Sequence, residues 1–187
     1  AYRLAKSCKE RGVPVVMGGP HVTALPEEAA AFCDAVVRGE GEPCWLEILD
    51  DCESGCLKSL YDGRDRNFDL ANSPAPAYEL LDIDKYNRLT VQTSRGCPHR
   101  CEFCASSVMI ANQYEQKPIA NVLREIDKIM EIWPQPFIEF ADDNSFVDKA
   151  YWKELLGDLQ TRKIKWFTET DISVSDDDEL LELMRES

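Results

Sequence analysis

Three cysteines lie within one segment of eight residues, CPHRCEFC, which spans residues 97–104. Their spacing is C-x3-C-x2-C, and three thiolates this close together can surround one metal centre at little cost in loop-closure entropy. A [4Fe–4S] cluster is normally held by four cysteines, so three would leave one iron with an open position for a small-molecule chelate. We therefore expect Cys97, Cys101 and Cys104 to be the ligands of an iron–sulfur cluster.

A zinc site or a redox-active group of thiols is the alternative for this segment. Zinc needs a fourth ligand, and the only nearby candidate is His99, which stands between two of the cysteines. Disulfides are another alternative, because the chain has eight cysteines and an even number is typical of secreted proteins. The N-terminus lacks the basic patch and apolar run of an export signal. The sequence therefore favours metal ligation in a reducing compartment and a cytoplasmic location.

Polar residues follow two of the apolar segments beyond the cysteines. Asp142, Asp143 and Asn144 come after the apolar run 137–141, and their oxygens are suited to accept hydrogen bonds from an ammonium group. A turn with a helix N-cap explains the same residues, since Asp and Asn are favoured there. Glu169 or Thr170 ends the next run in the same way, and a solvated strand face is an equal alternative for that position.

The composition is that of a globular protein and argues against several classes of function. Hydrophobic residues make up 44% and charged residues 30% of the 187 residues, and the formal net charge is −14. A chain this acidic is not expected to bind nucleic acid through its phosphates or to dock on an anionic membrane. No apolar stretch approaches the roughly 18 residues that a membrane span needs. The chain begins with Ala1 rather than Met, and we expect both of its ends to be cut from a larger protein.

The segments around the cysteines alternate between strand and helix patterns. A strand is expected directly before the cysteines, and helices with apolar faces separate it from two further strands. The expected strands are 89–93, 137–141 and 164–172. Asp148 is expected to cap the second helix, and Ser175 with Asp178 to form a capping box for the last one. These strand–helix repeats predict either half of a βα barrel or one side of an open sheet.

The first 52 residues show the same alternation on a smaller scale. Short apolar runs at 13–17 and 35–37 predict buried parallel strands. The expected helices are 1–11, one that begins at Pro26, and one around 44–52. The periodicity fades over 53–88, which we interpret as an interdomain connection that packs against its neighbours. The order of these elements predicts α/β layering around a parallel sheet.

The cysteine segment closely resembles the signature of the radical S-adenosylmethionine (SAM) superfamily, C-x3-C-x-aromatic-C, with Phe103 as the aromatic residue. The resemblance implies that SAM binds the open iron of the cluster and, on reduction, is split into methionine and a 5′-deoxyadenosyl radical. An electron donor such as flavodoxin or ferredoxin is then an implied partner. The resemblance also implies that Phe103 lies near the adenine, and that Asp142, Asp143, Asn144 and Glu169 lie near the methionine part of SAM.

The N-terminal segment resembles the C-terminal half of a cobalamin (B12)-binding domain, a Rossmann-like fold that precedes the radical SAM domain in one large class. The matching residues are Gly18 and Gly19 after the first strand, and Gly39, Glu40 and Gly41 after the second. The resemblance implies that Gly18 and Gly19 let the backbone approach the nucleotide tail of cobalamin, because they carry no Cβ. It also implies that the second segment is a tight loop near the cofactor pocket; simple turns are the alternative for both. The Asp-x-His-x-x-Gly motif with a cobalt-ligating histidine is not in the chain. His21 is not assigned to cobalt, and we expect it near the tail or in a hydrogen bond.

These resemblances predict an α/β chain in three parts. The parts are the C-terminal half of a Rossmann-like B12-binding domain (1–52), an interdomain connection (53–88) and the first βα units of a partial (β/α)6 radical SAM barrel (89–187). They imply a cobalamin-dependent methyltransferase that uses two SAM molecules to methylate an unactivated carbon of a small-molecule substrate. No catalytic residue is expected beyond the cluster ligands. The alternatives are a methylthiotransferase, which the acidic charge disfavours, a cyclase or rearrangement enzyme, and a non-catalytic cofactor-binding fragment.

Overall fold

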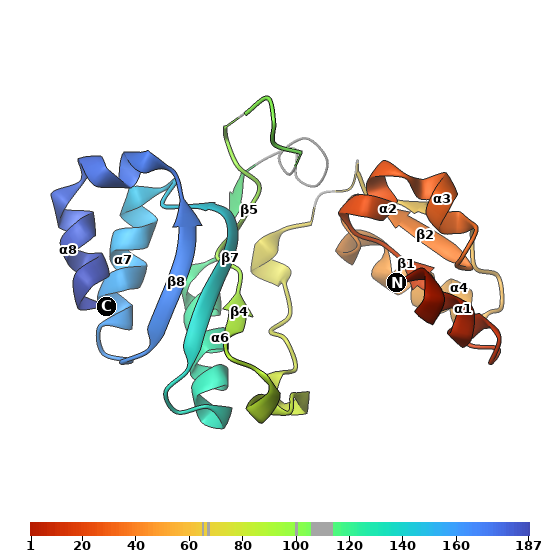
Figure 1. The fold of residues 1–187 in the computed structure, drawn as a ribbon, viewed down its shortest axis with the longest axis horizontal. Helices are drawn as coiled ribbons and strands as arrows, with labels where there is room; N and C mark the ends of the chain where they lie inside the picture. The colour runs from red at the N-terminus through yellow and green to blue at the C-terminus, as the bar shows by residue number, and fades with distance from the viewer. Residues whose placement is uncertain (65, 67, 100, 106–113) are drawn as a thin grey trace. The chain divides into compact units, whose positions relative to one another are not determined.

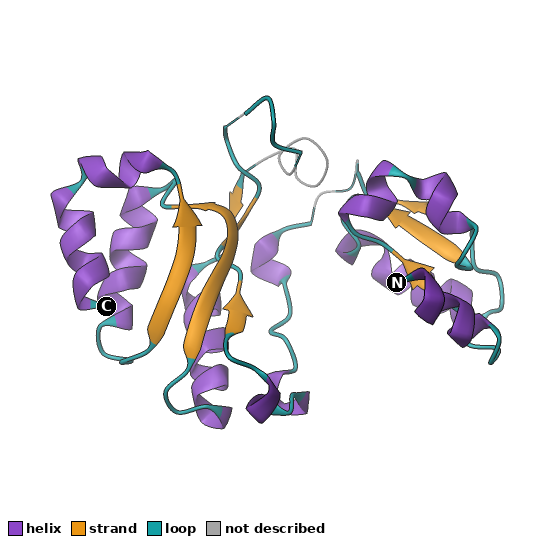
Figure 2. Cartoon of the chain, in the orientation of Figure 1, coloured by secondary structure: helices purple, strands orange, loops and turns teal. Residues whose placement is uncertain are grey.

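The computed structural model describes residues 1–64, 66, 68–99, 101–105 and 114–187 of the chain. It consists of two compact units, each built from strands and helices (Figures 1 and 2). Unit 1 comprises Ala1–Asp69 and Arg100–Asn112, and unit 2 comprises Leu70–His99 and Gln113–Ser187. One boundary between the units therefore falls inside the cysteine segment, between His99 and Arg100.

Unit 1 contains a three-stranded parallel sheet in the order β1-β2-β3. The strands are β1 (Val16–Met17), β2 (Ala35–Arg38) and β3 (Leu60–Asp62), and the helices are α1 (Tyr2–Lys9), α2 (Pro20–Ala24), α3 (Pro26–Ala30) and α4 (Glu42–Glu53). Side chains alternate between the two faces of a strand, so Val36 packs with α2 and α3, whereas Ala35 and Val37 pack with α4. Helices therefore cover both faces of this sheet, as the predicted α/β layering requires.

Unit 2 contains a parallel sheet whose strand order, β4-β7-β8, follows the order of the chain. The strands are β4 (Leu89–Val91), β7 (Phe137–Ser145) and β8 (Lys165–Thr170), and the helices are α6 (Ile119–Ile132), α7 (Lys149–Leu159) and α8 (Asp178–Glu186). An antiparallel pair is formed by β5 (Ser94–Arg95) and β6 (Glu115–Gln116). Short 3-10 turns are η1 (Leu70–Asn72), η2 (Tyr78–Leu80), η3 (Ile83–Lys85) and η4 (Ile172–Asp176).

The core of unit 2 lies on one face of its sheet. Ile138 and Phe140 of β7 are buried there together with the apolar stripes of α6 and α7. Trp152 is fully buried, and its ring lies 5.2 Å from that of Phe140, centroid to centroid. On the other face of β7, Glu139 is partly exposed and accepts a hydrogen bond from Arg88 at 2.5 Å. Over the described ranges, the helices of this unit thus pack on a single face of the sheet.

The expected strands and helices form, but β1, β4 and β8 are shorter than predicted. Three elements, α2, β5 and β6, have no counterpart in the prediction, and two further strands differ from it. The segment expected to be a connection contributes β3 to the first sheet, because Tyr61 is buried and its hydroxyl donates to Asp51 at 2.8 Å. The second strand of unit 2 does not end at Ala141 but continues to Ser145. The polar residues that were expected after this strand therefore belong to it.

Of the two predicted helix N-caps, the one of α7 is confirmed and the one of α8 is wrong. The carboxylate of Asp148 accepts the N–H groups of Ala150 and Tyr151 at 3.0 and 3.1 Å, so this residue caps α7 as predicted. The predicted capping box of α8 does not form, because its N-cap is Asp177, which accepts the N–H of Leu180 at 3.1 Å. Ser175 instead lies in η4.

Within the described ranges, no helix is both long enough and apolar enough to span a membrane.

Candidate cofactor site

The carboxyl ends of β4, β7 and β8 lie at the same edge of the second sheet, because the three strands are parallel. Ligand sites in parallel α/β folds are formed at this kind of edge. Polar residues gather here, and several of them are buried. The buried members are Thr93, Ser94, Asp142, Asn144 and Ser145. The edge is therefore an internal polar centre and not a solvated strand end.

Asp142 is the centre of this edge. Its Oδ1 accepts the backbone N–H groups of Thr93 and Ser94 at 2.8 and 2.9 Å. Its Oδ2 accepts the hydroxyls of Thr93 and Ser145 at 2.5 and 3.1 Å. Burial raises the pKa of the Asp142 carboxyl, and these hydrogen bonds oppose the rise. A carboxylate has about four acceptor positions, so the observed donors already use them.

Asp143 holds the residue that precedes the first cysteine. Its carboxylate accepts the backbone N–H of Gly96 at 3.0 Å. Gly96 has a φ of 81°, a left-handed conformation that glycine adopts without strain. In a regular strand Asp142 and Asp143 would point to opposite faces, but β7 departs from regular pairing between Phe140 and Ser145. Irregularities of this kind change the direction of side chains at a strand end. Here both carboxylates contact the same segment, 93–96.

Asn144 connects β7 to the histidine of the cysteine segment. Its amide nitrogen donates to Oδ2 of Asp171 at 2.8 Å, and its amide oxygen accepts the N–H of Asp171 at 3.0 Å. The same Oδ2 lies 3.1 Å from Nε2 of His99. Hydrogen bonds from Ser173 and Asn144 hold the pKa of Asp171 well below its usual value. Asp171 is therefore a charged acceptor beside the His99 ring at neutral pH.

The cysteines are all free thiols, which argues against the disulfide alternative. Cys101 is exposed, Cys97 and Cys104 are partly buried, and the N–H of Cys104 donates to the carbonyl of Cys101 at 3.0 Å. Cys97 belongs to unit 2, whereas Cys101 and Cys104 belong to unit 1. Among the residues that the structure describes, no three His, Cys, Asp or Glu side chains form a group that could hold a metal ion. The ligand set stays a prediction, and its donor chemistry, thiols at cluster spacing, fits the group.

Two other residues predicted to contact SAM are open to solvent. Phe103 exposes 92% of its surface, which leaves its ring uncovered. Glu169 is exposed on β8. Its carboxylate takes no part in the described hydrogen bonds that surround Asp142. The structure thus places three of the predicted SAM residues in hydrogen bonds at the strand edge, Asp142 and Asp143 with the segment before Cys97 and Asn144 with Asp171. The other two take no part in these contacts.

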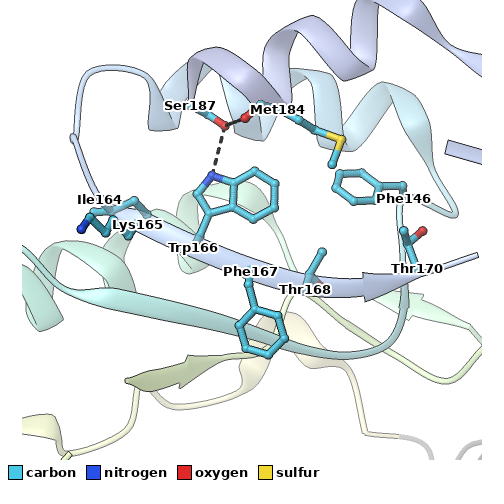
Figure 3. A pocket seen from close by; sticks show the side chains of 9 residues that line it. All are labelled: Phe146, Ile164, Lys165, Trp166, Phe167, Thr168, Thr170, Met184 and Ser187. Carbon is cyan, nitrogen blue, oxygen red and sulfur yellow. Dashed lines mark hydrogen bonds between the residues drawn. The ribbon is translucent and has the colours of Figure 1, made fainter. Parts of the chain in front are cut away.

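A pocket of about 460 Å³ lies between β8 and α8 (Figure 3). Its walls are mainly apolar and include Phe146, Trp166 and Met184. The indole N–H of Trp166 donates to Oγ of Ser187 at 3.1 Å across it. Of its described lining residues only Lys165 is charged, and Thr170 is the one that the sequence places among the possible contacts of SAM. This pocket therefore lacks the polar groups that the predicted chemistry needs.

The glycines of unit 1 lie at the carboxyl edge of the first sheet. Gly18 and Gly19 follow β1, and Gly39 and Gly41 follow β2. The N–H of Gly39 donates to Oγ1 of Thr23 at 2.9 Å, which ties the second loop to α2. Because β1 and β2 are parallel, both segments predicted to contact cobalamin lie at one edge.

These glycines differ in the space around them. A Cβ on Gly19 or Gly41 would meet no atom within 4 Å, so both positions face open space. Gly19 also has a φ of 95°, which a residue with a side chain rarely adopts. A Cβ on Gly39 would instead lie 2.8 Å from Cγ of Arg64. Gly19 and Gly41 thus fit a close approach of a ligand, whereas Gly39 fits close packing between loops.

Gly63, at the end of β3, has no space for a side chain. A Cβ there would lie 2.0 Å from the carbonyl oxygen of Glu40 in the loop after β2. We expect Gly63→Ala to lower the free energy of unfolding by about 1–3 kcal/mol, because the added methyl group must push the two loops apart. Urea unfolding of the complete protein measures this change.

A matched substitution in unit 2 separates overpacking from the general effect of replacing glycine. Gly157 lies inside α7, and a Cβ there would meet no atom within 4 Å. Gly157→Ala is expected to stabilise by about 0.5–1 kcal/mol, since alanine is favoured over glycine in a helix. Equal stability of Gly63→Ala and the unchanged protein would contradict the close packing at Glu40.

Some residues that build these edges are not evident from sequence patterns. Thr93 and Asp171 make the contacts that hold the polar edge together. Their only sequence signal is that Thr93 ends one expected strand (89–93) and that Asp171 lies near the end of another (164–172). His21 lies on α2 and shares hydrogen bonds with the hydroxyl of Tyr2 at 3.0 Å and the carboxylate of Glu28 at 3.2 Å. It is thus hydrogen-bonded, which is one of the two roles expected for it.

No family model matches the chain. Among curated proteins, it is 33% identical over 192 residues to an uncharacterised methyltransferase of Synechocystis sp., covering 97% of this chain and 35% of the relative. It is 30% identical over 169 residues to bacteriochlorophyllide d C-8(2)-methyltransferase of Chlorobaculum tepidum, covering 83% of this chain and 38% of the relative. It is 29% identical over 141 residues to an anaerobic magnesium-protoporphyrin IX monomethyl ester cyclase of Synechocystis sp., covering 65% of this chain and 28% of the relative.

Among solved structures, the chain is similar to TsrM of Kitasatospora setae, a radical SAM methyltransferase with cobalamin and a [4Fe–4S] cluster bound. The TM-score is 0.66 at 17% sequence identity, and the match covers 97% of this chain and 39% of that one. At this identity the likeness shows the fold, which confirms an α/β architecture with parallel sheets. The chain spans little more than a third of the length of each of these two curated methyltransferases.

Proposed function

We propose that this chain, which belongs to the cobalamin-binding radical SAM family, supplies cofactor-binding parts of a methyltransferase. One observation carries the proposal: the C-x3-C-x2-C segment follows β4 and β5 at the edge where buried polar residues gather. In βα barrels this edge holds the active site. The activity belongs to the whole protein, of which this chain is the cofactor-binding part in our proposal.

The organisation of the two units supports a division into two cofactor domains. We propose that 1–52 form the C-terminal half of a Rossmann-like B12-binding domain, because helices cover both faces of that sheet. We propose that 89–187 form the first βα units of a (β/α)6 barrel. The strands there follow chain order, and the described helices pack on one face. Residues 53–88 connect the two, and their first part adds β3 to the first sheet.

In this proposal Cys97, Cys101 and Cys104 hold the cluster, and Phe103 contacts the adenine of SAM with its uncovered ring. A reduced [4Fe–4S] cluster supplies the cleavage of SAM to a 5′-deoxyadenosyl radical, and cobalamin supplies the carrier of the methyl group. The protein holds these groups in position and excludes water. Direct contacts of Glu169 and Asn144 with SAM remain predictions, whereas the described hydrogen bonds of Asp142 and Asp143 support a role in positioning the cysteine segment.

The glycine edge of unit 1 is proposed to receive cobalamin. Gly18 and Gly19 are predicted to lie at its nucleotide tail, and Gly39, Glu40 and Gly41 near the cofactor pocket. Support comes from Gly19 and Gly41, where no atom would meet an added Cβ within 4 Å. The close contact of Gly39 with Arg64 gives the neighbouring loop a defined position beside them.

The proposed substrate is a small molecule with an unactivated carbon, and the proposed partner is an electron donor such as flavodoxin or ferredoxin. The net charge of −14 argues against a nucleic-acid substrate. Cyclisation is a second candidate activity, favoured by the similarity to the magnesium-protoporphyrin IX monomethyl ester cyclase. The two activities use the same SAM cleavage and differ in the fate of the methyl group.

The test uses the complete protein, prepared and reduced without oxygen. With SAM and a reductant it is expected to release 5′-deoxyadenosine and methionine, and added cobalamin is expected to change its absorbance spectrum on binding. An unchanged cobalamin spectrum would remove the B12 assignment, and the absence of 5′-deoxyadenosine would remove the radical assignment. Methyl-labelled SAM distinguishes the two activities, because only methyl transfer carries the label into the modified substrate, whereas SAM cleavage alone leaves it in methionine.

A further inference from the structure

The segment that leads from β4 to the first cysteine is held on two sides. On one side, as β5, it pairs with β6. On the other side, the backbone N–H groups of Thr93, Ser94 and Gly96 donate to the carboxylates of Asp142 and Asp143 at 2.8 to 3.0 Å. The backbone conformation at the start of the cysteine segment is therefore set by side chains of β7.

We propose that Asp142 and Asp143 are positioning residues that fix the direction in which Cys97 leaves the sheet, rather than ligands of SAM. The inference rests on the proposed function, since it takes Cys97 to hold the cluster. The described donors to Asp142 already fill the roughly four acceptor positions of a carboxylate. An ammonium group of SAM could bind there only by displacing one of these hydrogen bonds.

Burial makes the Asp142 contacts hard to replace. Thr93 and Ser94 are fully buried, and Asp142 is only 9% exposed. Water therefore cannot take the place of a lost acceptor at these N–H groups, and an unpartnered buried N–H carries its full desolvation cost. If the carboxylate is lost, we expect the segment to shift toward solvent and carry Cys97 with it.

A third contact lies beyond Cys97. His99 faces Asp171, and Asp171 is held by both atoms of the Asn144 amide. Gly96 on one side of Cys97 and His99 on the other are thus both tied to the strand edge formed by β7 and β8. This arrangement matches groups around metal ligands that orient the ligand without touching the metal.

The experiment measures how firmly the reconstituted cluster is held in the complete protein. Asp142→Asn keeps the volume and one acceptor oxygen, but it removes the charge and replaces the oxygen that accepts the hydroxyls of Thr93 and Ser145 with an NH2 donor. We expect cluster affinity to fall about 10–100-fold, the usual effect of losing a group that orients a metal ligand. The readout is the rate at which an iron chelator removes iron under anaerobic conditions, and it is independent of turnover.

Two further variants keep the test interpretable. Asp143→Ala removes an exposed carboxylate that accepts the N–H of Gly96, so it tests the same segment without changing a buried group. Its iron loss is expected to be about tenfold faster than in the protein without substitutions. Asp148→Asn changes a carboxylate that also accepts two backbone N–H groups, but at the start of α7. It is expected to change the melting temperature little, because Asn caps helices about as well as Asp, and to leave iron release unchanged.

The outcomes separate this inference from the proposed function. An unchanged protein that takes up no iron overturns both. If the protein without substitutions binds iron, and Asp142→Asn and Asp143→Ala release their iron at the same rate as that protein, only the inference is overturned. The inference is also overturned if both variants keep their cluster but bind SAM more weakly, since that result assigns the two carboxylates to SAM.

Discussion

Replacing Cys101 by alanine is expected to remove nearly all iron from the reconstituted protein, from about four irons per chain to close to none. The predicted cluster has three protein thiolates and one open iron, so no protein ligand can replace a lost one. The chain offers His99 nearby, but its Nε2 lies 3.1 Å from Asp171 and is engaged there. Iron and sulfide analysis after anaerobic reconstitution, together with the absorbance spectrum, measures the loss.

Cys56→Ala is the matched control for this experiment. Cys56, like Cys101, is an exposed free thiol, but it lies outside the motif. Iron content is expected to be the same in Cys56→Ala and in the unchanged protein. Stoichiometric zinc in place of iron would refute the predicted cluster. An equal loss of iron in Cys101→Ala and Cys56→Ala would show that the iron binds to thiols non-specifically.

Strands made of consecutive apolar residues are predictable from the sequence. β2 is an example: Ala35, Val36 and Val37 are all buried because helices cover both faces of the sheet. β3 gives no such signal, because only Tyr61 of its three residues is buried. Its pairing with β2 depends on a partner far away in the sequence, which local periodicity does not record.

The polar end of β7 shows more clearly that local sequence patterns do not record contacts with distant residues. Asp and Asn are rare in strands and common in turns, so the sequence predicts a turn after Ala141. In the structure Asp142 and Asn144 stay in the strand, because Thr93 and Asp171 supply hydrogen bonds to their buried side chains. Tertiary contacts thus outweigh the local preference.

In the candidate cofactor site, too, the sequence predicts the local features but not the contacts between distant segments. The spacing of Cys97, Cys101 and Cys104 is local information, and it is sufficient to predict a cluster. The partners that orient this segment come from β7 and from Asp171, so no sequence window contains them. The contact of Gly63 with the Glu40 carbonyl is likewise a meeting of two loops. A glycine in a turn has the same appearance in the sequence whether its free side faces a ligand or another loop.

The buried pair Lys117–Glu125 is expected to give the largest loss of stability. Nζ of Lys117 lies 2.9 Å from Oε1 of Glu125, and their side chains are only 4% and 2% exposed. Glu125→Ala leaves a buried ammonium without its partner, and removing one member of such a pair costs about 3–5 kcal/mol. Urea unfolding followed by the fluorescence of Trp152 and Trp166, both in unit 2, measures the change.

The double substitution Lys117→Met with Glu125→Leu tests whether the loss arises from the unpaired charge. Exchanging a buried ion pair for apolar residues of similar volume is often neutral or stabilising by about 1–4 kcal/mol, so the double variant should recover most of the stability. Recovery would also restore the cysteine segment, because the N–H of Lys117 donates to the carbonyl of Thr93 at 2.8 Å and supports it opposite Asp142. A single variant that costs under about 1 kcal/mol would show that solvent reaches the pair, as in surface salt bridges.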